Sequence, residues 1–115
     1  MAHEMPARPV VADGAAVVDF PWDAAEAAVT ALDAAVAELS VQAEGHALLR
    51  STITDWEGAF RDEHDDAYYR LSTTLWGVLG QLSFRAGAIV AAAEEAVEEQ
   101  LRRNEDARLL QTGPH

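Results

Sequence analysis

Apolar residues recur with the spacing of an α-helix in two stretches of the chain, separated by a break near residue 56. Residues of the first stripe lie alternately four and three positions apart: Ala25, Val29, Leu32, Val36, Leu39 and Ala43. A similar stripe in the second stretch comprises Phe60, His64, Tyr68, Leu71, Leu75, Val78, Leu82, Ala86, Ile89, Ala93 and Val97. Positions spaced in this way share one side of a helix, so the pattern predicts helices over about 23–53 and 59–107.

The segments outside these helices predict little regular structure. Residues 1–19 contain Gly14 and two prolines, which interrupt helices and strands, so we interpret them as a flexible N-terminal arm. Residues 20–108 are the predicted hairpin domain, and residues 109–115 are expected to form a frayed tail. The predicted fold class is all-α, with the two helices forming an antiparallel helix-turn-helix hairpin.

The second predicted helix carries a further apolar face, roughly opposite to its stripe. At about 100° per residue, several aromatic and small residues cluster on that face. They are Tyr69, Trp76, Gly80, Phe84, Gly87 and Ala91. One neighbouring helix cannot cover both faces, so we predict a partner interface at these residues and dimerisation into a four-helix bundle. The alternative is that the arm folds back over this face through Val10, Val11 and Val17.

Composition limits the class of partner. The 115 residues include 20 acidic and 8 basic side chains, and the formal net charge of -12 repels phosphate backbones and anionic membranes. We therefore predict no nucleic-acid partner. Hydrophobic types make up 50% of the chain, and glycine and proline are few, as is typical of helical proteins.

Residues 71–93 are long and apolar enough to suggest a membrane span. The segment nevertheless contains Ser72, Gln81 and Arg85, so we interpret it as a buried helix and predict no stable membrane insertion. The first residues of the chain also lack the basic start and apolar core of a secretory signal peptide. We therefore expect the protein to be cytoplasmic when made.

The sequence contains no recognisable pattern for catalysis, metals or cofactors. A di-iron site in a helical bundle needs Glu-x-x-His pairs, yet neither His46 nor His64 has Glu three residues earlier. The chain has no Cys, no glycine-rich phosphate loop and no interpretable Ser/His/Asp arrangement. We therefore predict that the protein is not an enzyme and that it binds no metal or cofactor.

Trp56, Glu57 and Gly58 lie between the two predicted helices. Glycine tolerates the positive φ that a tight turn often needs, and a tryptophan can cap the open end of a hairpin with apolar surface. This arrangement resembles the WXG family, the small ESAT-like helical hairpins that type VII (ESX) secretion systems export. The resemblance covers about residues 20–107 and implies that Trp56 and Gly58 are the turn residues.

The resemblance implies a function in type VII secretion through protein–protein binding. Members of the family assemble as homodimeric or heterodimeric four-helix bundles, so the implied partner is a second copy or a paralogous WXG-like hairpin. A secretion ATPase and a toxin are further candidate partners, and the implied route out of the cell is type VII secretion without a signal peptide. One family feature is missing, since Tyr68 and Tyr69 are followed four residues later by Ser72 and Thr73 and no Tyr-x-x-x-Asp/Glu signal results.

Two other functions fit the same residues. A cytosolic chaperone or antitoxin-like adaptor would hold a client protein on the face that contains Trp76 and Phe84. A ligand-binding helical bundle would instead place a pocket between its helices. Cell fractionation separates the first alternative from secretion, and native mass spectrometry would detect a bound small molecule.

Overall fold

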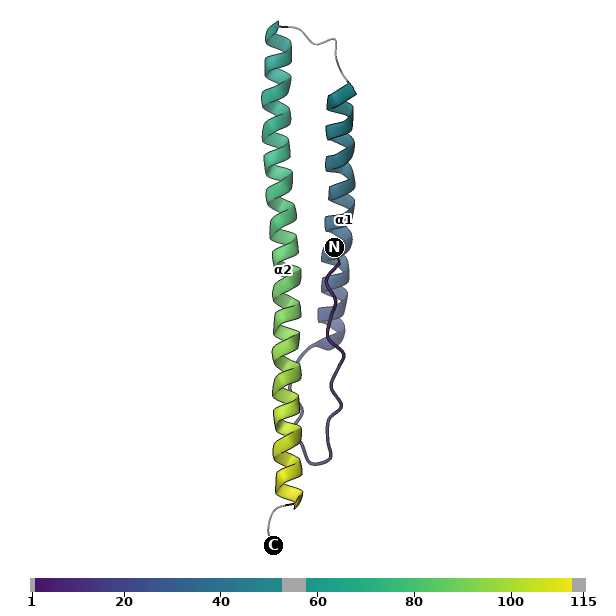
Figure 1. The fold of residues 1–115 in the computed structure, drawn as a ribbon, viewed down its shortest axis with the longest axis vertical. Coiled ribbons are helices and arrows are strands. Elements are labelled where there is room, and N and C mark those ends of the chain that lie inside the picture. The colour runs from purple at the N-terminus through teal and green to yellow at the C-terminus, as the bar shows by residue number, and fades with distance from the viewer. Residues whose placement is uncertain (1, 53–57, 113–115) are drawn as a thin grey trace. The chain divides into compact units, whose positions relative to one another are not determined.

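The computed structural model describes residues 2–52 and 58–112, whose regular secondary structure is entirely helical. Helix α1 comprises Trp22–Thr52, and helix α2 comprises Gly58–Thr112 (Figure 1). No strand occurs in the described part of the chain. The predicted all-α class is therefore confirmed, whereas the antiparallel hairpin and its dimer stay predictions.

The chain divides into two compact units, each with its own core. The terminal unit comprises Met1–Thr30 and Ala86–His115, and the middle unit comprises Ala31–Arg85. The terminal unit thus contains the N-terminal arm, the start of α1 and the second half of α2. The middle unit contains the rest of α1 and the first half of α2.

In the terminal unit the N-terminal arm, residues 2–21, runs along α2 without regular secondary structure and reverses direction once (Figure 1). At the reversal the Ala15 amide donates a hydrogen bond to the Ala12 carbonyl at 3.0 Å. Gly14 has a φ of 80° there, a backbone conformation that residues with a side chain rarely adopt. The turn therefore requires glycine, or a residue such as asparagine that tolerates this conformation.

Helix α1 begins where the arm reaches Pro21. The Pro21 carbonyl accepts a hydrogen bond from the Ala25 amide at 2.9 Å, which closes the first helical turn. Arg8 of the arm forms an ion pair with Asp23 in that turn. Both side chains of the pair are largely exposed, so the contact orients the arm but adds little stability.

Small side chains form most of the core of the terminal unit. The least exposed residues of α2 in this unit recur every seven positions, at 0, 0, 2 and 6% exposure: Ala86, Ala93, Gln100 and Ala107. Helix α1 contributes Ala25 and Val29 to the core. A seven-residue repeat is typical of coiled coils, and alanine in such positions lets a neighbouring backbone approach closely.

The middle unit buries Ala43 of α1 and Leu79 of α2. Leu79 lies one heptad before Ala86, outside the stripe that the sequence predicts, whereas Leu71 and Val78 of that stripe are 51% and 39% exposed. The predicted stripe advances by more than 3.5 residues per step and therefore drifts around the helix relative to the observed heptad. Among the described residues, no large side chain is fully buried.

Helix α2 continues to Thr112, which is beyond the end at about 107 that the sequence predicts. Two side-chain contacts accompany these extra residues. The Gln111 side-chain amide donates to the Asp13 carbonyl of the arm at 2.8 Å, and the Thr112 hydroxyl donates to the Arg108 carbonyl at 2.9 Å. The arm thus contacts residues that the sequence analysis assigns to a frayed tail.

One helical stretch of the described chain, Asp62–Thr112, is long and apolar enough to cross a membrane by length and composition alone. Its most apolar 18-residue window has a mean hydropathy of 1.3, and 11% of that window is buried. The sequence predicts a buried helix here. Most residues of this segment are exposed in the structure, and the expected burial stays a prediction.

Candidate functional site

The turn motif between the helices is described only in part. Trp56 and Glu57 lie outside the described residues, and Gly58 is the first residue of α2. The predicted roles of Trp56 and Gly58 as turn residues therefore stay predictions.

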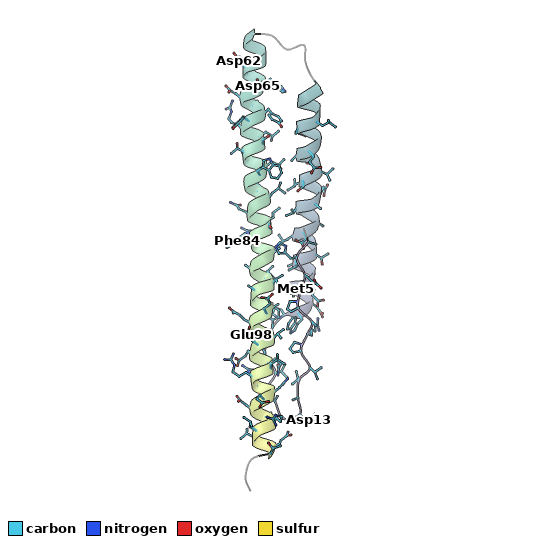
Figure 2. All side chains as sticks on the ribbon, in the orientation of Figure 1. Met5, Asp13, Asp62, Asp65, Phe84 and Glu98 are labelled. Carbon is cyan, nitrogen blue, oxygen red and sulfur yellow. The ribbon has the colours of Figure 1, made fainter. Side chains whose placement is uncertain are left out.

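In the middle unit, the aromatic residues of the predicted partner interface are exposed on α2. Tyr69 is 75% exposed, Trp76 is 58% exposed, and Phe84, labelled in Figure 2, is 78% exposed. At about 100° per residue these three positions lie within roughly 80° of one another around the helix axis. They therefore form one exposed aromatic face on the middle unit.

The small residues of the predicted interface differ in their surroundings. A Cβ atom added to Gly80 would meet nothing within 4 Å, so the helix surface beside Trp76 is open. In the terminal unit, a Cβ added to Gly87 would lie 3.6 Å from His3 Nε2 of the arm. Ala91, also in the terminal unit, is exposed. Gly80 is therefore a position on this side of α2 where another backbone has room to approach, and Gly77 is equally open.

The alternative in which the arm covers this face through its valines stays a prediction, because the arm and the aromatic residues belong to different units. Val10 is 83% exposed, Val17 is 67% exposed and Val11 is 40% exposed. Trp76 is 58% exposed and Phe84 is 78% exposed. Within the terminal unit, polar side chains of α2 contact the arm.

Gln100 is the centre of the contacts between the arm and α2. It is only 2% exposed, and its side-chain amide is fully used. Its Oε1 accepts a hydrogen bond from the Val18 amide at 2.8 Å, and its Nε2 donates to the Ala16 carbonyl at 3.1 Å and to Asn104 Oδ1 at 3.0 Å. A buried amide with all of these partners holds the arm in one register along α2.

Further side chains of α2 continue the contacts with the arm. Asn104 accepts from the Ala12 amide at 3.0 Å and donates to the Val10 carbonyl at 2.7 Å. Arg103 donates to the Val17 carbonyl at 2.9 Å. With Gln111 on the Asp13 carbonyl, these groups extend along α2 to the turn of the arm, where Figure 2 labels Asp13.

Gln100, Asn104 and Gln111 form a docking strip for the arm that the sequence pattern does not predict. Contacts between side-chain amides and main-chain atoms leave no periodic pattern in the sequence of the arm. One signal was present in the helix: Gln100 lies one heptad after Ala93 and interrupts a row of alanines with a polar group. A polar residue in a buried row needs a partner, and the partner here is the arm.

A hollow of about 520 Å³ lies between the arm and α2 in the terminal unit. Its apolar lining includes Val11, Val17 and Ala96. It is also bordered by Phe20 and Trp22, whose rings pack edge to face with centroids 4.8 Å apart. If the protein were a ligand-binding bundle, this hollow would be where the terminal unit holds a small molecule. Among the described residues, no group of three or more His, Asp or Glu could hold a metal ion.

Charged pairs along the end of α2 are at least partly exposed. Arg108 Nε donates to Glu105 Oε2 at 3.0 Å, and this hydrogen bond lowers the pKa of Glu105 and raises that of Arg108. Arg103 Nε donates similarly to Glu99 at 3.1 Å, one turn earlier. Such exposed pairs are screened by water and salt, and they support the helix only slightly.

The described fold and surfaces define an all-α protein with two helices, one exposed aromatic face and a docked N-terminal arm. No known protein family, no curated protein and no solved structure matches the chain.

Proposed function

We propose that this protein is a WXG-like component of type VII (ESX) secretion that acts as one subunit of a helical dimer. In this proposal the two helices form an antiparallel hairpin, and two hairpins pair into a four-helix bundle. The observation that carries the proposal is the mismatch between core and surface in the middle unit. Leu79 is its one large buried side chain among those described, while Tyr69, Trp76 and Phe84 are exposed.

A second hairpin on the aromatic face would resolve this mismatch. Burying an aromatic side chain stabilises a complex by roughly 2–3 kcal/mol, and buried aromatic residues dominate many interfaces. Gly80, one turn from both Trp76 and Phe84, would let the partner backbone come close enough to contact both rings.

The charge of the chain bears on the kind of partner. With a formal net charge of -12, two identical copies repel each other at low ionic strength. A less acidic paralogous hairpin would avoid this repulsion, whereas a homodimer should tighten as salt is added. The salt dependence of association therefore distinguishes the two assemblies.

Light scattering on the purified chain tests the interface. We expect wild type to have a mass of twice 12.4 kDa at micromolar concentration, and Trp76→Ala to shift it towards the monomer. Val41→Ala removes an apolar side chain that is 68% exposed on α1 and serves as the control that should leave the mass unchanged. A wild-type monomer that Trp76→Ala does not affect, and that does not pair with a co-expressed neighbouring hairpin, would contradict the proposed interface.

Secretion is tested separately in the producing cell. The protein should appear in the culture medium when the secretion ATPase is present and stay in the cytosol when the ATPase is deleted. Trp56→Ala should reduce export without changing the mass of the purified dimer, because the predicted role of the turn is recognition by the secretion machinery. Retention in the cytosol in both strains would favour the chaperone or antitoxin-like adaptor.

A further inference from the structure

The arm is held on α2 mainly through its main chain. Side chains of α2 form hydrogen bonds with main-chain atoms of six arm residues: Val10, Ala12, Asp13, Ala16, Val17 and Val18. The arm's own side chains contribute less, since Val10 and Val17 are mostly exposed. Contacts of this kind select for backbone conformation and spacing, and they tolerate changes in the side chains of the bound segment.

The groups that hold the arm belong to a single rigid element. Gln100, Asn104 and Gln111 all lie on α2, whose backbone hydrogen bonds are made within the helix. Their spacing of four and seven residues places them on one side of that helix. The strip therefore keeps its geometry when the arm is absent, and it then presents unpaired amide groups to whatever segment replaces the arm.

We propose that the docking strip of Gln100, Asn104 and Gln111 is a peptide-binding site that takes an extended segment by its main chain. Arm residues 10–18 are its tethered occupant. The N-terminal arm of a second copy has the same spacing and the same glycine turn, and it is the occupant that we assign in trans. This site is independent of the proposed interface at Trp76, because none of its groups belongs to the aromatic face.

The test uses the full chain with a weakened tethered arm. Val18→Pro removes the amide that donates to Gln100 and leaves every group of the strip intact. Hydrogen exchange should show faster exchange of the Ala12 amide in this variant than in wild type, because release of the arm frees its bond to Asn104. A synthetic peptide of residues 8–20, added to the variant, should then shift the side-chain amide NMR signals of Gln100 and Asn104.

Two pairs of matched controls distinguish binding by the strip from nonspecific association. On the protein, Gln100→Leu added to Val18→Pro should weaken peptide binding by about tenfold or more, the loss expected for a buried hydrogen-bonded amide, whereas the exposed Gln81→Leu should not. On the peptide, methylation of the Val18 amide nitrogen should also weaken binding by about tenfold, whereas Val17→Thr should change affinity by less than about threefold.

Three outcomes would overturn the proposal. Unchanged exchange of the Ala12 amide in Val18→Pro would mean that the bond between Val18 and Gln100 does not hold the arm on the strip. Absence of peptide binding to a chain whose arm is released would mean that the strip recognises only its tethered segment. Equal binding with and without Gln100→Leu would place the peptide elsewhere.

Discussion

Leu79 and Leu71 offer a direct test of which side of α2 forms the core of the middle unit. The two residues are of the same type on the same helix, but Leu79 is 5% exposed and Leu71 is 51% exposed. The predicted stripe includes Leu71 and omits Leu79, so it predicts that Leu71→Ala lowers stability more than Leu79→Ala does. The heptad in the structure predicts the reverse.

The expected magnitudes follow from burial. Full burial of a leucine side chain stabilises a protein by about 2 kcal/mol, and truncation of a buried leucine adds the cost of the cavity, so Leu79→Ala should lower the free energy of unfolding by about 3 kcal/mol. Leu71→Ala removes a side chain that is half exposed, and about 1 kcal/mol or less should be lost. The gain in helix propensity on replacing leucine with alanine is the same at both sites and cancels in the comparison.

Thermal and urea unfolding monitored by circular dichroism at 222 nm measure both variants. For a chain of this size, about 3 kcal/mol corresponds to a fall in melting temperature of roughly 10 °C, and about 1 kcal/mol to roughly 4 °C. Each variant should be compared with wild type at the same protein concentration, because dimerisation raises apparent stability. A loss for Leu71→Ala that equals or exceeds that for Leu79→Ala would refute the heptad register.

Three further changes test other parts of the structure. Gly14→Ala should release the turn of the arm from α2, because φ is +80° there and the new Cβ would lie 3.2 Å from Gln111 Nε2. Faster hydrogen exchange of the arm amides would report this release, and unchanged exchange would contradict the turn geometry. Gly80→Ala should stabilise the single chain by up to about 1 kcal/mol while weakening self-association, so a dimer that tightens would contradict close backbone approach there. Glu105 has a lowered pKa in the folded chain, so its small contribution to stability is present above its unfolded pKa and is lost as pH falls through the folded pKa. Glu105→Gln should therefore flatten the acid limb of stability against pH slightly, and a steeper limb would contradict the sign.

Helical periodicity predicted the fold class because repeated spacing along a helix is written in the sequence itself. The phase of the core was harder to predict. Leu71, Val78 and Leu79 are all apolar, and only their contacts with α1 decide which of them is buried. A small difference in period, accumulated over several turns, is enough to exchange Leu71 for Leu79.

The docked arm could not be predicted for a different reason. Its binding depends on main-chain atoms, which every residue possesses, and on amides such as Gln100 and Asn104 that commonly occur on exposed helix surfaces. The valines of the arm suggested apolar docking, yet Val10 and Val17 remain exposed. The sequence indicated a segment with some capacity to dock, and the choice of polar contacts became visible only with the structure.

The row of alanines in the terminal unit also affects how precisely the helices and the arm are aligned. Ala86, Ala93 and Ala107 present nearly the same small surface at multiples of one heptad, so a neighbouring segment that slips by seven residues would find almost the same contacts. Gln100 makes the alignments that differ by seven residues unequal. A slip by one heptad would separate its buried amide from the Val18 amide and the Ala16 carbonyl, so one polar side chain distinguishes the native alignment from an otherwise similar one.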